Sequence, residues 1–198
     1  MPFSDVQICN LALSRIKVGY QIQALNELSQ EAAACSLAYQ FNRECALREY
    51  EWPFSGRFAA LALIQSGLVP NWAYSYRLPA NCLKVRRITT GEKSLNPDYA
   101  YTMGSDDVGL ILHTDQTSPT IEYTHAIIDP TLFPADFASA LAWRLAADIA
   151  IPLSANPGMA AAASAKYDEA ISRAFVAAMD EVSAAPAADN EFSACRQQ

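Results

Sequence analysis

The sequence predicts an α+β protein, in which an alpha-helical bundle of about five helices carries an inserted small antiparallel β-sheet lobe. Apolar residues recur at helical spacing towards both ends of the chain, whereas residues 72–128 alternate between apolar and polar types. The chain has 198 residues, of which 52% are hydrophobic, and this is enough to build a core. We expect four segments: the first half of the bundle, 1–70; the β-rich lobe, 71–130; the second half of the bundle, 131–184; and a flexible C-terminal tail, 185–198.

Three helices are expected in the first segment, over residues 4–17, 29–51 and 53–65. Ser4 and Ser29 are suitable N-cap residues, because a serine side chain can accept a hydrogen bond from the first helical turn. Pro53 suits the first position of the third helix. The residues expected to face the core are Ala34, Leu37, Ala38, Phe41 and Cys45 in the second helix and Phe54, Phe58, Leu61 and Gln65 in the third.

The β-rich lobe is expected to contain four or five short strands. Tyr74, Tyr76 and Leu78 alternate with polar residues, which is typical of a half-buried strand. Further strands are expected over residues 83–89, 99–103, 110–114 and 120–127. Residues 104–109 predict a hairpin loop, whose acidic pair, Asp106 and Asp107, lacks the spacing of a calcium-binding loop.

The second half of the bundle is expected to contain two helices, over residues 135–151 and 157–183. Pro152 is expected to end the first of them, and Asn156 with Pro157 to begin the second. Their apolar stripes are rich in alanine, which lets helices approach closely but buries little area per residue. We therefore expect some apolar surface to be left for neighbouring molecules, with a closely packed monomer as the alternative.

Patterns that carry catalysis or metal binding are missing from the sequence. It contains no HExxH, GxSxG, Walker or GxGxxG motif, and His113 and His125 have no partner ligand at metal-binding spacing. We expect no enzyme activity, no cofactor and no metal. The five cysteines include no closely spaced pair, which suits a reducing compartment, and most of them are expected to be buried. No apolar run reaches the length that spans a bilayer, so we expect no membrane partner.

A basic cluster stands out in a chain whose net charge is −7: Lys84, Arg86, Arg87 and Lys93. One interpretation is a solvated strand face that protects a sheet edge, and the other is contact with phosphate or with an acidic partner. The acidic balance argues against a dedicated nucleic-acid reader but not against a surface past which DNA slides. Aromatic residues gather between Tyr50 and Tyr76, where they either join the helices to the sheet or form an interface.

Four stretches follow one another in a recognisable order. They are ICNLALSRIKVG, ELSQEAAACSLAYQFNRECALREYEWPFSGRFAAL, NWAYSYRLPANCLKVRRI and IEYTHAIIDPTLFPADFASALAWRLAADIAIPL, and together they cover most of residues 6–155. The third has the spacing Trp-x-Tyr-x-Tyr-x-x-Pro-x-x-Cys, and the fourth joins a Tyr-containing strand to an alanine- and leucine-rich helix through an Asp-Pro turn. In this order they resemble the tail tubular protein A family, the head-to-tail adaptor (gatekeeper) proteins of short-tailed bacteriophages.

The resemblance implies a structural protein of the virion, assembled in the host cytoplasm and located in the tail or neck. Members of this family form a ring, usually of twelve copies, that joins the portal protein to the tail nozzle protein and lines the DNA exit channel. The expected partners are therefore copies of the same chain, the portal, the nozzle and DNA passing without sequence-specific contact. We expect the β-rich lobe to face the neighbouring tail component, and the polar tail, with Asp189, Glu191, Phe192 and Arg196, to dock on the portal.

A second hypothesis is a soluble α+β binding or regulatory module outside virions. It would hold a ligand in a pocket between the sheet and the helices, lined by Trp72 and the neighbouring tyrosines.

Overall fold

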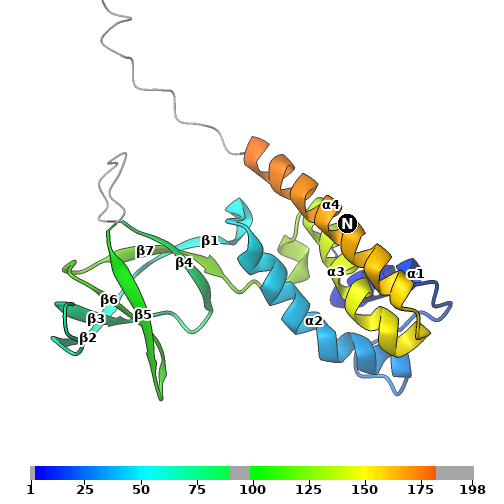
Figure 1. The fold of residues 1–198 in the computed structure, drawn as a ribbon, viewed down its shortest axis with the longest axis horizontal. Coiled ribbons are helices and arrows are strands. Elements are labelled where there is room, and N and C mark those ends of the chain that lie inside the picture. Colours follow the sequence, from blue (N-terminus) through cyan, green and yellow to red (C-terminus); the bar gives the residue numbers. More distant parts are fainter. Residues whose placement is uncertain (1–2, 90–98, 182–198) are drawn as a thin grey trace, which may run out of the picture.

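The computed structural model describes residues 3–89 and 99–181. Within these residues, four α-helices form one part of the molecule and seven strands in two antiparallel sheets form the other (Figure 1). The strands lie between the two pairs of helices along the chain. The α+β class is thus confirmed, with four helices in the described residues where the sequence predicted about five.

The helical part is organised around one central helix, α3 (Ala135–Ser154). The helices α1 (Asp5–Arg15), α2 (Gln30–Glu49) and α4 (Pro157–Asp180) each pack against it, and α4 runs alongside it over most of its length (Figure 1). Because the side chains that α3 buries include several alanines, the neighbouring helices can lie close to its axis. These alanines are Ala138, Ala140, Ala142, Ala146 and Ala150.

The predicted N-caps are confirmed. The Ser4 hydroxyl accepts from the Gln7 amide, and the Ser29 hydroxyl accepts from the Ala32 amide. The Asn156 side chain accepts from two amides at the start of α4. Each cap satisfies backbone groups that the first helical turn leaves without a partner.

The sequence predicted that Pro152 ends α3, and this prediction is wrong. The helix continues to Ser154, and Ala155 follows it in a left-handed conformation with φ of 50°. A proline in the last turn removes a single backbone donor, and here the Ser154 hydroxyl adds a bond to the Ala150 carbonyl at 2.6 Å. Among the described helices α3 alone has the length and composition that would also allow a membrane crossing, and half of that stretch is buried in the bundle.

The second helix faces the core with a different side from the one predicted. Leu37 and Phe41 are 86% and 64% exposed, and the side chains that α2 buries include Leu47 and two polar residues, Asn42 and Arg43. Asn42 can be buried because its amide donates to Asp148 of α3 at 2.7 Å and to the Ala38 carbonyl at 2.9 Å. The prediction was wrong for Leu37 and Phe41 because it rested on the spacing of the apolar residues alone.

The strands form two sheets that pack against each other. One sheet has the order β1 (Gly56–Ala60), β7 (Thr120–His125), β4 (Cys82–Thr89), and the other has the order β2 (Ala62–Ser66), β3 (Tyr74–Arg77), β6 (Gly109–Thr114), β5 (Tyr101–Asp106). The chain passes from the first sheet to the second at Leu61, which is buried. A second hydrophobic cluster surrounds it, separate from the helical core, with Tyr76, Val85, Leu112, Ile121 and Tyr123 among its members.

The helix predicted over 53–65 is wrong. A single 3₁₀ turn, η1 (Pro53–Ser55), leads directly into β1 and β2, so the sheet part begins at Gly56 rather than at residue 71. The run after Gly56 is apolar without clear alternation, and such a run fits a helix and a strand equally well when read alone. Pairing with β7, from Gly56 opposite Thr124 to Ala60 opposite Thr120, decides in favour of the strand.

The predicted hairpin is confirmed, with a tighter turn than expected. Strands β5 and β6 pair up to Asp106 opposite Gly109, which leaves only Asp107 and Val108 in the turn. The Asp106 carboxylate accepts the amides of Val108 and Gly109 and forms an ion pair with Arg77 at 2.6 Å. This guanidinium lowers the pKa of Asp106 well below its usual range.

Two leucines of α2 provide a matched test of which side of this helix is buried. We expect Leu47→Ala to lower the free energy of unfolding by about 2–5 kcal/mol, because Leu47 lies in the core. Leu37→Ala should change it by less than about 0.5 kcal/mol, because Leu37 is exposed. Equilibrium unfolding in urea measures both, and equal losses in the two variants would contradict the described orientation of α2.

Candidate interaction surfaces

The predicted basic cluster lies on β4, and its members differ in exposure. The side chain of Arg86 is only 5% exposed, whereas that of Arg87 is 62% exposed and that of Lys84 is partly exposed. The pairing of β4 with β7 is irregular between Val85 and Arg87, where the buried Arg86 is followed by the exposed Arg87. Lys93, the fourth member, lies outside the described residues.

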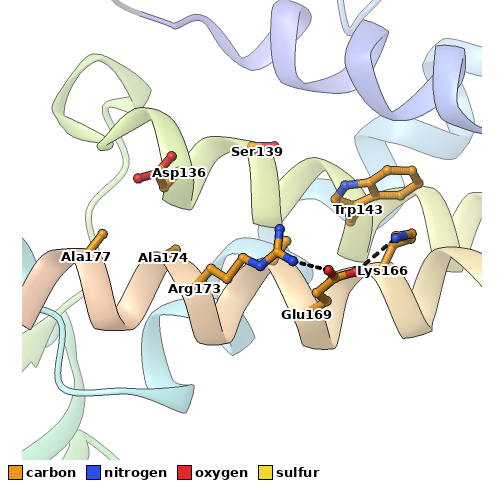
Figure 2. Close-up of a pocket in the computed structure, with 9 residues that line it drawn as sticks. Asp136, Ser139, Trp143, Lys166, Glu169, Arg173, Ala174 and Ala177 are labelled. Atoms are coloured by element: carbon orange, nitrogen blue, oxygen red, sulfur yellow. Dashed lines mark hydrogen bonds and ion pairs between the residues drawn. The ribbon is translucent and has the colours of Figure 1, made fainter.

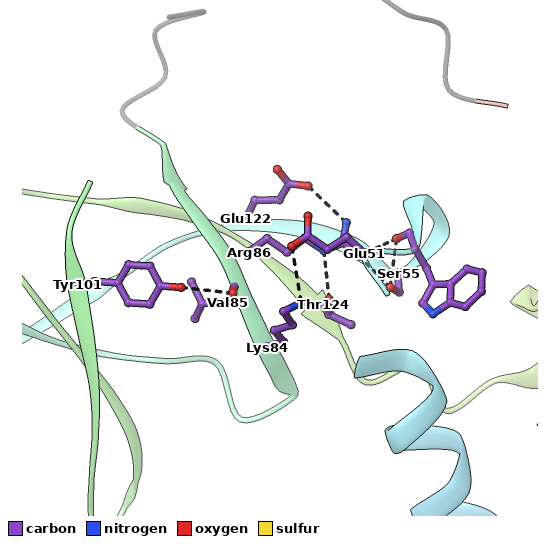
Figure 3. A network of polar contacts seen from close by, with 9 residues as sticks. Glu51, Ser55, Lys84, Val85, Arg86, Tyr101, Glu122 and Thr124 are labelled. Atoms are coloured by element: carbon purple, nitrogen blue, oxygen red, sulfur yellow. Dashed lines mark hydrogen bonds and ion pairs between the residues drawn. The ribbon is translucent and has the colours of Figure 1, made fainter. Parts of the chain in front are cut away.

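Arg86 is bound inside the molecule, at the junction between the helices and the sheet (Figure 3). Its Nη2 donates to the Trp52 carbonyl at 2.6 Å and to the Ser55 hydroxyl at 3.0 Å. Its Nε donates to the Thr124 hydroxyl at 3.1 Å, and Nη1 lies 3.4 Å from Glu122. A guanidinium with this many partners holds the strand β7, the strand β4 and the turn after α2 in one arrangement.

The exposed cations of the cluster are paired as well. Lys84 lies 3.7 Å from Glu51 (Figure 3). Arg87 forms an ion pair with Glu122. Each of the three cations that the structure describes therefore has a carboxylate neighbour. This arrangement supports the structural interpretation for Arg86 and leaves Lys84 and Arg87 as the members at the surface.

The aromatic residues around Trp52 join the core of the helices to this junction. Trp52 is buried, and its ring lies against Phe137 of α3 with centroids 5.1 Å apart. Its indole nitrogen donates to the Ala46 carbonyl at 2.9 Å. Phe58 departs from the predicted core face and is largely exposed, whereas Tyr76 lies in the core of the sheets.

A hollow of about 400 Å³ lies beside the junction, next to Phe58, Arg87 and Phe175. Trp72 is not among the residues that line it, so the predicted ligand pocket with Trp72 at its wall does not form here.

Large apolar side chains are exposed on both parts of the molecule. On the helical part, Leu37 and Phe41 lie one turn apart on α2, and we call this pair the α2 stripe. On the sheet part, Phe58 on β1, Leu63 on β2 and Leu110 on β6 are exposed. The molecule thus presents apolar side chains on both its helical part and its sheet part.

A groove runs between α3 and α4, and Figure 2 shows one end of it. It consists of two hollows, of about 590 and 450 Å³, which both adjoin Trp143 and Lys166. The first extends to Asp136 and Ala177, at the start of α3 and the end of α4. The second extends past Arg15 and Lys17 to the start of α4. We call the two together the α3/α4 groove.

The α3/α4 groove contains a partly buried cation, Arg15, to which residues 3–89 and 99–181 supply no carboxylate partner. The Arg15 guanidinium lies 4.2 Å from the centroid of the Trp143 ring and donates to the Ser139 carbonyl at 2.7 Å and hydroxyl at 2.9 Å. Burial lowers its pKa to about 10, so it remains charged at neutral pH. Among the described residues, neither Arg15 nor Lys17 forms an ion pair, whereas Lys166 and Arg173 share Glu169 (Figure 2).

The two histidines lie in different sheets and do not form a common site. His113 is buried on β6, and its Nδ1 lies 2.8 Å from the Ser75 hydroxyl. His125 is at the end of β7, where burial lowers its pKa. The part of the chain that the structure describes contains no group of three or more His, Cys, Asp or Glu side chains that could hold a metal ion.

Three cysteines are buried as small apolar residues, as the sequence predicts: Cys9, Cys35 and Cys82. Sequence reasoning missed that Cys9 of α1 and Cys35 of α2 are in contact, and the hydrogen bond between the two thiols raises the pKa of Cys9. Cys45 is half-buried, and Cys195 lies outside the described residues. The predicted docking residues of the tail, Asp189, Glu191, Phe192 and Arg196, also lie outside them.

No family model matches the chain, and no curated protein matches it either.

The two neighbouring arginines of β4 allow a matched test of the junction. We expect Arg86→Met to lower the free energy of unfolding by about 3 kcal/mol or more, because it removes the buried guanidinium that joins Glu122 to the Trp52 carbonyl and the Ser55 hydroxyl. Arg87→Met should cost less than about 1 kcal/mol, because Arg87 is largely solvated. Urea unfolding measures both losses, and an Arg86 variant as stable as the Arg87 variant would show that the network does not hold the junction.

Proposed function

We propose that this chain is a structural virion protein, the head-to-tail adaptor that forms a ring between the portal and the tail nozzle and lines the DNA exit channel. The observation that carries the proposal is the α2 stripe, two large apolar side chains that the fold leaves in water. Isolated apolar residues are common on protein surfaces, whereas a leucine and a phenylalanine one helical turn apart make an apolar patch that a partner can cover. The resemblance of four sequence stretches to the tail tubular protein A family supports the same function.

A closed ring needs two different contact surfaces on each copy, because each copy binds one neighbour with one face and the next neighbour with another. The α2 stripe and the exposed residues of the sheet part are of different structure and lie on different parts of the chain, which suits such a contact. The internal pairing of Arg86, Arg87 and Lys84 also suits a channel protein, since strong free cations would hold passing DNA.

A soluble binding module remains the alternative, and the hollow of about 400 Å³ at the junction favours it, since ligand sites commonly have this size. The two functions differ in assembly: a binding module stays monomeric beside a portal, whereas an adaptor forms rings on it.

The α2 stripe provides a test of ring formation. We expect the full chain, mixed with the portal protein of the same virus, to form portal-bound rings in electron micrographs and in native mass spectra. The double variant Leu37→Ser, Phe41→Ser should keep the unfolding midpoint of the parent and lose the rings, because both side chains are exposed in the free chain. The matched control, Gln40→Ser with Arg48→Ser on exposed positions of the same helix, should keep them. Rings that persist in the stripe variant would contradict the role of the stripe, and a parent chain that forms none would contradict the adaptor function.

The tail provides a second test. We expect deletion of residues 185–198 to leave the urea unfolding curve unchanged and to abolish binding to the portal, measured by co-sedimentation. The control is a full-length chain whose last fourteen residues have the same composition in scrambled order. Portal binding that survives the deletion would show that the tail is not the docking segment.

A further inference from the structure

The α3/α4 groove has the properties of a binding site for an acidic, extended peptide. Its floor includes small residues, Ala170, Ala174 and Ala177, and Trp143 adjoins both of its hollows. At its far end, Arg15 and Lys17 have no carboxylate partner within the described residues. A partly buried guanidinium that has no carboxylate partner in the described ranges favours an anion beside it.

The segment that follows α4 is the candidate occupant, because α4 ends beside the groove. The helix α4 ends at Asp180, next to Ala177 and Asp136, which line the near end of the groove. From Asp180 back to Lys166 is fourteen residues of helix, or about 21 Å at a rise of 1.5 Å per residue. The nine residues from Asp180 to Asp189 span up to about 30 Å when extended. A chain that turns back after α4 therefore brings Asp189 level with Lys166, and Glu191 can reach Lys17.

The composition of the tail matches the groove along this path. Residues 183–188 read SAAPAA, and such small side chains suit the stretch beside Arg173 and Glu169, whose charges are already paired. The two carboxylates of Asp189 and Glu191 come next, followed by one aromatic residue, Phe192. On such a path these carboxylates would come near Lys166, which already pairs with Glu169, and near Arg15 and Lys17, which have no carboxylate partner among the described residues.

We propose that residues 182–192 of this chain bind back along the α3/α4 groove of the same molecule, with Asp189 and Glu191 next to Lys166, Arg15 and Lys17. A tethered segment is present at an effective concentration in the millimolar range, so even weak binding fills the groove from within the chain before another copy does at micromolar concentration. The site stands on the groove and on the reach of the tail, and it does not depend on the adaptor function.

A spin label on the tail tests the proposal in the full chain. The label is attached at Asn190→Cys in a chain that also carries Cys45→Ser and Cys195→Ser, since the other three cysteines are buried. The tryptophan indoles are labelled with ¹⁵N, and Trp143→Phe identifies the signal of Trp143. We expect the nitroxide to broaden the Trp143 signal at least threefold more than that of Trp72, which precedes β3 in the sheet part. Equal broadening of the two signals would overturn the proposal.

A mixing experiment separates binding within a chain from binding between chains. Spin-labelled chain without ¹⁵N is mixed with ¹⁵N-labelled chain without the nitroxide. The Trp143 signal should stay sharp in this mixture, and broadening there would show that the groove receives the tail of a second copy, which would overturn binding within the chain.

Charge reversal tests the named contacts. Lys17→Glu with Lys166→Glu should remove the excess broadening of Trp143, and adding Asp189→Lys with Glu191→Lys should restore it. Arg57→Glu, a reversal at an exposed position of the sheet part, is the control that should leave it unchanged. Added salt should progressively weaken the broadening of the Trp143 signal in the unaltered chain, because salt screens the proposed pairs between tail carboxylates and groove cations. Broadening that survives both the reversal and the salt would overturn the electrostatic contacts proposed here.

Discussion

The rest of the structure depends on the contact between Trp52 and Arg86. The indole of Trp52 lies in the helical core against Phe137, while its backbone carbonyl accepts a hydrogen bond from Arg86 of the sheet part. Trp52 thus contacts both parts of the molecule, and the Arg86 guanidinium that donates to it is almost fully buried. A buried guanidinium is tolerated only when its partners are all in place, so the junction has one favourable arrangement rather than a range of them. The neighbouring Gly56 fits this constraint, because a Cβ there would lie 2.7 Å from Nη1 of Arg86.

The distribution of charge and apolar side chains determines which surfaces the described residues leave open to other molecules. Most ion pairs of the described residues join neighbouring elements of the same molecule, as between Arg77 and Asp106 or between Arg86 and Glu122. In the part of the chain that the structure describes, two kinds of surface remain for other molecules: the apolar residues of α2 and the sheet part, and the cationic end of the α3/α4 groove. The first kind suits another folded surface, and the second suits a flexible acidic segment.

Local signals in the sequence were enough to predict the helix starts and the hairpin. Ser4, Ser29 and Asn156 act as caps through contacts within three residues, and no distant partner is needed to identify them. The buried side of α2 could not be predicted in this way, because Asn42 is buried through Asp148, which is 106 residues away along the chain. The role of Arg86 and the groove beside Arg15 likewise depend on residues that only the folded chain brings together.

The order of elements along the chain has a consequence for synthesis on the ribosome. The helices α1 and α2 pack mainly on α3, which follows both sheets in the sequence. While the sheets are being made, the two N-terminal helices have no core to join, and Leu47 and Trp52 lack the aromatic and alanine surface that later covers them. The nascent chain therefore exposes both of these side chains and the α2 stripe at the same time, and in this interval it has the greatest need of a chaperone.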